Sequence, residues 1–318
     1  MILNTIFGNK KIHYLKSVAH KQLPQYVFRD GTKLLWNPIL KKAFVDLPEE
    51  RVRLQLIEYL ISDAGFSKAR ISFESPVNLP GDKSASRTDI ICYDKEFKPL
   101  LLVECKSPDI SLSEKASIQI ARYNQKIGAP FLLISNGLED YWFRDSSGTL
   151  QELHELPSGF RSQHESTEHF DYWVQRGFVG NKSHPESRKW ILESCELLYG
   201  SKSTSSPKYF KFEGAPNELF LPNYYSIFGL NETLKLAVSL TATPFGATRL
   251  NCVLNKNGKN TALLSASLDL IAKGDSKNTI LQTNSGIQKI DISAKRRFNF
   301  SESINDQVSN LSDFLSEL

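Results

Sequence analysis

Residues 87–106 read RTDIICYDKEFKPLLLVECK, and this stretch decides the fold of the N-terminal half of the chain. Two apolar runs, Thr88–Tyr93 and Leu100–Cys105, have the aliphatic and β-branched character of strands. The polar segment Asp94–Pro99 between them is short and ends on proline, as turns often do. The stretch therefore predicts an antiparallel hairpin.

Charged residues stand at the two ends of this hairpin that antiparallel pairing brings together. Asp89 lies near the start of the first strand, and Glu104 lies near the end of the second. Because side chains alternate along a strand, Glu104 and Lys106 share one face of the sheet while Cys105 points to the other. Two carboxylates and one ammonium are expected to converge.

This residue set suits phosphodiester chemistry. Asp89, Glu104 and the backbone carbonyl of Cys105 are the hard oxygen ligands that Mg²⁺ or Mn²⁺ prefers. Lys106 beside such a metal could orient a water and stabilise negative charge in a transition state. A surface ion pair worth at most about 1 kcal/mol is the alternative. The apolar run Leu100–Val103 leads directly into Glu104, which favours a functional role.

The segments around the hairpin predict a mixed sheet flanked by helices. A helix begins at Leu47-Pro48 with acids in its first turn and stops near Gly65. A second helix runs from a capping box at Ser111 and Glu114 to Gly128. Further strands are expected at Ile71–Val77, Pro130–Ser135 and Tyr141–Phe143. The fold class is therefore α/β.

The hairpin also resembles a known signature. Arg87-Thr88-Asp89-Ile90 followed by Val103-Glu104-Cys105-Lys106 resembles that of PD-(D/E)xK nucleases. Four more segments resemble the N-terminal nuclease domain of type I restriction enzyme R subunits, so the resemblance covers about residues 36–145. These segments are Trp36-Asn37-Pro38-Ile39, Pro48-Glu49-Glu50-Arg51-Val52-Arg53, Gln119-Ile120-Ala121-Arg122-Tyr123-Asn124 and Ser135-Asn136-Gly137.

The resemblance implies a restriction-endonuclease-like fold and assigns roles to residues. It implies that Asp89 and Glu104 bind metal, that Glu50 completes the acidic site, and that Lys106 is catalytic. Gln119 and Tyr123 lie four residues apart on one helical face, and they match an element that positions the scissile strand or the lysine. The substrate implied is DNA, and other restriction-system subunits are the implied partners.

Two features depart from the family pattern. The proline of the signature is not adjacent to Asp89, and Pro76 on the preceding strand is its nearest counterpart. The sequence has no GxxxxGK[ST] loop for ATP phosphates. We therefore expect no ATP site and no complete translocating subunit.

Charge and composition suggest four segments. Residues 1–35 form a basic N-terminal arm with six Lys or Arg against one Asp, which could contact phosphates or be a solvated extension. Residues 36–150 form the nuclease domain. Residues 151–207 form a helical linker, with helices expected at Glu165–Gln175 and Pro185–Tyr199. Residues 208–318 form a smaller, β-rich α+β domain ending in an amphipathic helix.

Several classes of protein are disfavoured. No apolar run is long enough for a membrane span, and the first residues lack the pattern of a secretory signal. The four cysteines are scattered, without a CxxC pair, so neither a zinc site nor a disulfide framework is expected. A cytoplasmic location is the expectation.

Three functions remain open on this basis. The first is a Mg²⁺-dependent DNA endonuclease of a restriction, defence or repair system, whose C-terminal region recognises a target or partner. The second is an inactive nuclease fold that serves as a DNA-binding or scaffold module. The third is cleavage of RNA or modified DNA, because a metal reads phosphate and not the base.

Overall fold

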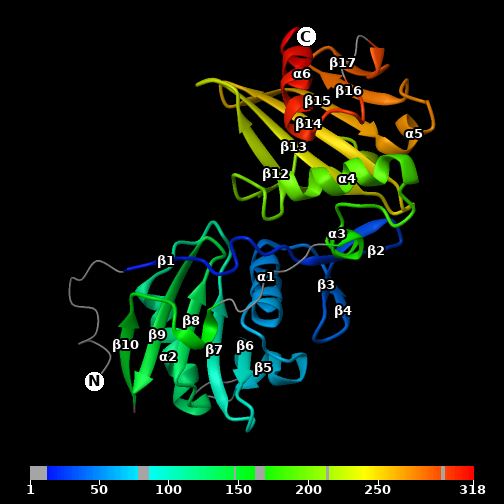
Figure 1. Ribbon diagram of the computed structural model, residues 1–318. Helices are drawn as coiled ribbons and strands as arrows, with labels where there is room; N and C mark the ends of the chain where they lie inside the picture. The colour runs from blue at the N-terminus through cyan, green and yellow to red at the C-terminus, as the bar shows by residue number, and fades with distance from the viewer. Residues whose placement is uncertain (1–12, 78–85, 147, 162–168, 213–214, 295–297) are drawn as a thin grey trace. The chain divides into compact units, whose positions relative to one another are not determined.

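A computed structural model of the chain describes residues 13–77, 86–146, 148–161, 169–212, 215–294 and 298–318 (Figure 1). The chain divides into two compact units. Unit 1 comprises residues 1–27 and 34–166, and unit 2 comprises residues 28–33 and 167–318. Among the described residues, no helix has the length and apolar character needed to cross a bilayer.

Unit 1 is built on a seven-stranded mixed sheet in the order β1-β9-β8-β7-β6-β5, with β10 also paired to β9 (Figure 1). The β7–β8 pair is parallel, and the other pairs are antiparallel. The strands are β1 (Leu15–Lys16), β5 (Ile71–Val77), β6 (Ser86–Tyr93), β7 (Pro99–Cys105), β8 (Phe131–Ser135), β9 (Glu139–Ser146) and β10 (Thr149–Leu153).

Two helices pack against this sheet at its central strands. Helix α1 (Pro48–Ser62) contacts β7, and helix α2 (Glu114–Ile127) contacts β7 and β8. One core cluster joins Ile120 of α2 to Leu102 and Leu132 of the sheet, and all three are fully buried. The parallel β7–β8 pair requires a crossover, which α2 supplies.

The predicted elements of this unit are confirmed, and the mixed α/β class with them. The hairpin of β6 and β7 has the expected antiparallel pairing. The predicted capping box is wrong, because α2 begins at Glu114 and Ser113 is its N-cap residue. The helix does end at Gly128, whose φ of 72° is the left-handed conformation that favours glycine.

The segment predicted as a basic arm contains strands from residue 15 onward. Strand β1 pairs with β9 of unit 1. Strands β2 (Gln25–Arg29), β3 (Thr32–Asn37) and β4 (Lys42–Phe44) form a separate three-stranded sheet. Residues 1–12, which include Lys10 and Lys11 of the predicted arm, lie outside the described residues. Part of the predicted arm therefore belongs to β-sheets.

Unit 2 is built on a second seven-stranded sheet, which is antiparallel between every pair of neighbours for which pairing is described. Its strands follow chain order: β11 (Lys208–Phe210), β12 (Asn223–Gly229), β13 (Leu234–Ala242), β14 (Thr248–Lys256), β15 (Lys259–Ser267), β16 (Thr279–Thr283) and β17 (Gly286–Ile290). The expected strand at Leu234 and the hairpin turn at Asn257-Gly258 are confirmed, with φ of 52° and 80° at the turn.

Four helices accompany this sheet: α3 (Phe170–Gln175), α4 (Pro185–Leu198), α5 (Leu268–Ala272) and α6 (Ile304–Ser316). Helix α4 falls in the predicted linker, yet it contacts β13, α5 and α6 and belongs to unit 2. Its buried Trp190 and Ile191 explain this placement, because an apolar face must pack against a core. Residues 165–168 of the other predicted linker helix lie outside the described residues, and α3 matches the remainder of that helix.

Gly180 of unit 2 provides a test of the packing. A Cβ at this position would collide with the backbone carbonyls of Gly246 and Ala247. We expect Gly180→Ala to lower the free energy of unfolding by about 2 kcal/mol or more, since backbone cannot yield as a side chain does. Urea denaturation measures this. Gly229→Ala, where no atom lies within 4 Å of the added Cβ, is the control and should change stability little. Equal effects of both substitutions would contradict the packing described.

Candidate active site

Strands β5, β6 and β7 bring three carboxylates into one region of unit 1. The β6–β7 pairing begins at Ile90 and Val103, and Asp89 and Glu104 are the next residues beyond it. The charge of Asp89 raises the pKa of Glu104, so these two carboxylates lie near each other as predicted. Glu74 of β5 contacts the same arginine, Arg53, as Asp89 does.

Both carboxylate oxygens of Asp89 are engaged. Its Oδ2 accepts a hydrogen bond from the backbone N–H of Cys105 at 2.6 Å. Its Oδ1 lies 2.8 Å from Nη2 of Arg53, which comes from α1. The Asp89 side chain is only 13% exposed. Asp89 therefore links the first helix to the two strands of the hairpin.

Arg53 is the centre of an ion-pair cluster. Its guanidinium lies 2.6 Å from Glu50 Oε2, 3.0 Å from Glu49 Oε1 and 3.5 Å from Glu74 Oε1, in addition to Asp89. Burial lowers the pKa of Arg53, but the surrounding carboxylates outweigh burial and raise it. Arg53 is therefore a permanent positive charge among four acids.

Glu104 forms a second group with Lys106 and α2. Its Oε1 lies 2.6 Å from Lys106 Nζ and accepts a hydrogen bond from Gln119 Nε2 at 2.7 Å. Gln119 Nε2 also lies 3.2 Å from the hydroxyl of Tyr123. The structure thus brings together the predicted residues Glu104, Lys106, Gln119 and Tyr123, and the direct partner of Gln119 is the carboxylate.

Burial and mutual repulsion raise the pKa values of the acids of this site. Burial raises the pKa of Glu104 to about 7, and the charge of Asp89 adds to the increase. Burial also raises the pKa of Glu50 and of Asp89, against the opposing charge of Arg53. Burial lowers the pKa of Lys106, but its hydrogen bond to Glu104 and the Glu104 charge raise it overall. Lys106 is therefore an ammonium at neutral pH.

The cluster holds more negative than positive charge. Five carboxylates, those of Glu49, Glu50, Glu74, Asp89 and Glu104, face two cations, Arg53 and Lys106. Oε1 of Glu50 is buried without a hydrogen-bond partner. This excess and this unpaired oxygen fit a divalent cation, which prefers carboxylate ligands. However, no three His, Cys, Asp or Glu side chains of the described residues already converge closely enough to hold one.

Sequence reasoning missed Arg53, Glu49 and Glu74. Arg53 and Glu49 stand in the first helix segment that resembles the family, but no local pattern tells which of its charged residues faces the hairpin. Glu74 depends on the β5–β6 register, which its local sequence does not determine. Its backbone φ of 50° is unusual for a residue other than glycine. Pro76, the expected counterpart of the signature proline, lies on β5, pairs with Arg87 of β6 and is exposed.

Cys105 contributes backbone groups at this site. Its side chain is fully buried, and burial raises the pKa of its thiol well above the ordinary value. A neutral buried thiol is a poor nucleophile. The other three cysteines, Cys92, Cys195 and Cys252, are also free and buried, as expected for small apolar side chains.

Loss of Arg53 should destabilise the metal-free protein. Arg53→Gln would leave Asp89 and Glu50 without their counter-charge, so we expect the free energy of unfolding at pH 8 to fall by about 3 kcal/mol or more. Chemical denaturation measures the change. Lys189→Gln, which breaks an exposed pair with Glu193 at 4.0 Å, should leave stability nearly unchanged. A stable Arg53→Gln protein would show that the cluster does not need this cation.

Glu104 should make stability fall with rising pH. Its pKa is about 7 in the folded chain, against an ordinary value of 4.5. The folded state therefore binds more protons between these values, and the stabilisation present below the lower value is lost as pH rises through the higher one. We expect a loss on the order of 2 kcal/mol between about pH 5 and about pH 8 in the absence of divalent metal.

Denaturation across this pH range, with a chelator present, tests the assignment. Glu104→Gln removes one titrating group and should reduce the slope, while Glu50 and Asp89, whose pKa values are also raised, keep part of it. Glu96→Gln, at an exposed position in the turn between β6 and β7, is the matched control and should leave the slope as in the unsubstituted chain. An unchanged slope in Glu104→Gln would assign the pH dependence to other acids.

Comparison with known proteins supports the family resemblance for part of the chain. Residues 48–157 match the family described as "Type I restriction enzyme R protein N terminus (HSDR_N)". This segment contains α1, the hairpin of β6 and β7, and α2. The predicted resemblance to the N-terminal domain of type I R subunits is confirmed there by the family match.

One solved structure is described as the fragment structure of an HsdR subunit of a type I restriction enzyme from Vibrio vulnificus YJ016. It shares 20% sequence identity with this chain at a TM-score of 0.28. The alignment covers 46% of this chain and 28% of that chain, so the chain spans well under half of that relative's length. No curated protein matches.

Proposed function

We propose that this protein is a Mg²⁺-dependent endodeoxyribonuclease that hydrolyses phosphodiester bonds with the site around Asp89, Glu104 and Lys106. The observation that carries the proposal is the pair of buried carboxylates, Asp89 and Glu104, beside the ammonium of Lys106 where the β6–β7 pairing begins. The Glu104 pKa near 7 shows that its ionised form is unfavourable in the metal-free protein, where acids outnumber bases. A bound cation would stabilise that ionised form. Groups with perturbed pKa values cluster at functional sites.

Four groups would hold the metal. They are the carboxylates of Asp89 and Glu104, the carbonyl oxygen of Cys105, and Glu50, whose Oε1 is buried and unpartnered. Each carboxylate oxygen has two lone pairs, so Asp89 can keep its bond from the Cys105 N–H and still bind a cation. When bound, Mg²⁺ polarises the phosphoryl group and lowers the pKa of a coordinated water.

Other residues of the site would orient the carboxylates and stabilise the negative charge of the transition state. Lys106 stays protonated, so its role is to donate hydrogen bonds to phosphoryl oxygens and to balance developing negative charge, and it does not act as a base. Gln119, supported by Tyr123, would fix the Glu104 carboxylate in position through their hydrogen bonds. Arg53 would hold Asp89 and Glu50 in place from α1.

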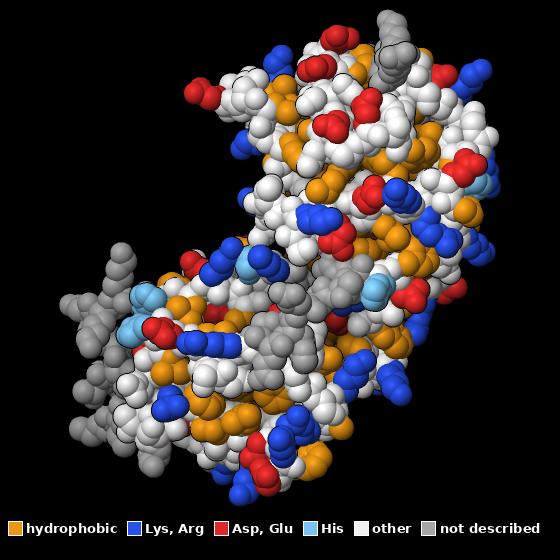
Figure 2. Space-filling view, viewed as in Figure 1, with side chains coloured by type: hydrophobic (Ala, Val, Ile, Leu, Met, Phe, Trp, Pro, Cys, Tyr) orange, Lys and Arg blue, Asp and Glu red, His pale blue; other side chains and the backbone are white. Residues whose placement is uncertain are grey.

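The proposal extends to fold and partners by way of the family. Residues 36–150 would form a restriction-endonuclease-like nuclease domain, with DNA as substrate and other restriction-system subunits as partners. Residues 208–318 would contribute target or partner recognition. In the view of Figure 2, Lys and Arg side chains alternate with Asp and Glu on each unit without one continuous basic face.

One observation favours a second function, a scaffold or DNA-binding module without hydrolysis. Arg53 already forms ion pairs with Asp89 and Glu50, and in the described part of the chain no three acidic, histidine or cysteine side chains form a ready metal cage. A guanidinium can replace a metal as the counter-charge of an acidic cluster. The two functions differ in whether divalent metal binds and DNA is cut.

Plasmid cleavage by the full chain tests the proposal. With Mg²⁺ or Mn²⁺ we expect nicked or linear DNA, and Asp89→Asn or Lys106→Ala should reduce the rate by about a hundredfold or more because each removes a group that acts on the transition state. Lys98→Ala, in the turn of the same hairpin, is the control and should retain activity.

Calorimetry with Mn²⁺ separates the two functions. Binding by the unsubstituted chain that is lost in Asp89→Asn supports the nuclease. If Mn²⁺ does not bind, and neither DNA nor RNA is cut under any metal, the scaffold function is correct and the nuclease proposal fails.

A further inference from the structure

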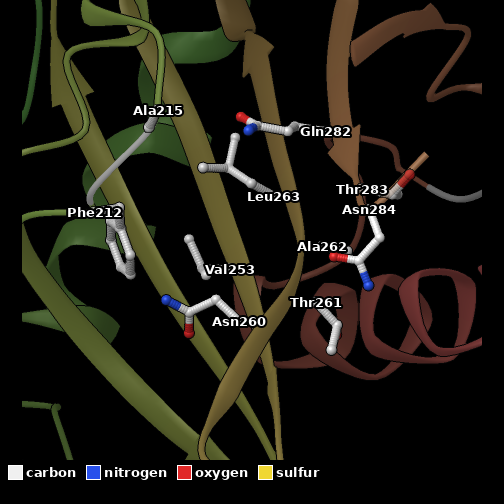
Figure 3. A pocket seen from close by; sticks show the side chains of 10 residues that line it. All are labelled: Phe212, Ala215, Val253, Asn260, Thr261, Ala262, Leu263, Gln282, Thr283 and Asn284. Atoms are coloured by element: carbon white, nitrogen blue, oxygen red, sulfur yellow. The ribbon is translucent and has the colours of Figure 1, made fainter. Parts of the chain in front are cut away.

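Unit 2 has a shallow cavity over β14, β15 and β16, with a volume of about 140 Å³ (Figure 3). Figure 3 shows the side chains of Val253 and Leu263 near its centre. The described residues of its lining include no acidic, basic or histidine side chain, so the lining gives no chemical preference for one ligand. In unit 1, by contrast, a set of hydrogen bonds bears directly on the candidate active site.

The loop that follows β7 begins with Lys106. Strand β7 ends at Cys105 and α2 begins at Glu114, and residues 106–113 between them contain neither helix nor strand. Residues 108–111 are exposed. Exposed loops are the mobile parts of a fold unless bonds from elsewhere hold them. The position of Lys106 therefore depends on what anchors this loop.

Tyr14 anchors the far end of the loop from the N-terminal segment, which we define as residues 13–25. Its hydroxyl donates a hydrogen bond to the carbonyl oxygen of Leu112 at 2.8 Å. The Tyr14 ring lies edge-on to the buried ring of Tyr141, with 5.6 Å between ring centroids. Burial raises the pKa of the Tyr14 hydroxyl, and nearby glutamates add to the increase, so this group stays a donor at neutral pH.

Ser17 anchors the near end of the loop through β8. The N–H of Lys106 donates to the carbonyl oxygen of Ser135, the last residue of β8, at 2.8 Å. The Ser135 hydroxyl lies 3.2 Å from the hydroxyl of Ser17, and both side chains are buried. Ser17 is held in turn, because its N–H donates to the carbonyl oxygen of Leu138 at 2.9 Å. The N-terminal segment thus contacts the backbone partner of Lys106.

The N-terminal segment also contacts α1, which carries part of the ion-pair cluster. Gln55 Nε2 of α1 donates to the carbonyl oxygen of Gln22 at 2.7 Å, and Gln25 Nε2 donates to Glu58 Oε1 of α1 at 2.8 Å. One segment therefore contacts α1, the end of β8 and the loop after Lys106. It lies outside residues 48–157, so the family match does not account for it.

We propose that the N-terminal segment positions Lys106 for catalysis, with Tyr14 and Ser17 as positioning residues. The proposal rests on the proposed function, because it assigns these residues to the hydrolysis at that site. Both act through the backbone on either side of Lys106, so their loss should leave the metal ligands in place. A displacement of about 1 Å can lower the rate of an enzyme about a hundredfold. Loss of one anchor among several should cost less.

Hydrogen–deuterium exchange of the metal-free full chain tests the anchoring. Tyr14→Phe and Ser17→Ala each remove one hydroxyl, so we expect the hydrogen-bonded amides of Lys106 and Ile110 to exchange about fivefold faster in each variant. Tyr93→Phe is the matched control, because Tyr93 packs on the same core cluster and its hydroxyl has no hydrogen-bond partner among the described residues. The amides of β6 should keep their protection in all three variants, which separates local release from loss of the fold.

Cleavage kinetics with Mg²⁺ test the positioning. Under single-turnover conditions we expect Tyr14→Phe to lower the rate about tenfold, while the DNA concentration that gives half the maximal rate and the affinity for Mn²⁺ stay unchanged. In a Lys106→Ala background the same substitution should lower the residual rate no further, because a residue that acts through Lys106 then has nothing to position. Tyr93→Phe should retain the full rate.

Two outcomes would overturn the proposal. One is unchanged exchange of the Lys106 amide in both Tyr14→Phe and Ser17→Ala. The other is an equal loss of rate on Tyr14→Phe with and without the Lys106 side chain, which would mark Tyr14 as only structural. Lack of cleavage by the unsubstituted chain is a different result. It defeats the proposed function, and the exchange measurement still decides whether the N-terminal segment holds the loop.

Discussion

The ion pair between Arg53 and Asp89 is the interaction on which the N-terminal unit depends. Strands β5, β6 and β7 bring Glu74, Asp89 and Glu104 into one region, and buried carboxylates cannot stay ionised there without a counter-charge. Arg53 supplies it from α1 while also holding Glu50. The first helix is thereby fastened to the hairpin at the point where the carboxylates meet, which ties the fold of the unit to the chemistry of its site.

Much of this unit could be predicted from local sequence. Apolar alternation and turn residues were enough to predict the β6–β7 hairpin, and the same patterns predicted that Asp89 lies near Glu104. Arg53 could not be found this way, because helical periodicity says which residues share a face and not which strand that face meets. Glu74 joins this region through strand pairing that no local pattern specifies. Long-range pairing of charged side chains is what sequence reasoning lacked.

The domain boundaries were harder to predict for a similar reason. Composition separated residues 151–207 as a helical linker, but whether a helix connects two units or packs on one depends on what its apolar face meets. Trp190 and Ile191 of α4 are buried, and the helix contacts β13. In the same way, the excess of lysine near the N-terminus concealed strand residues such as Leu15 and Tyr26. Net charge indicates how well a segment is solvated, but it does not show whether the backbone of that segment pairs with a strand.

The pairing of β1 with β9 has a consequence for how the chain can be shortened. Lys16 and Leu15 pair with one end of β9, and the N–H of Val18 donates to the buried carboxylate of Asp140 at 2.9 Å. A chain lacking its first twenty residues would leave backbone donors and acceptors of β9 open to solvent and remove a partner of Asp140. Open strand edges recruit other chains, so such a truncated protein would aggregate even with every residue of the hairpin intact.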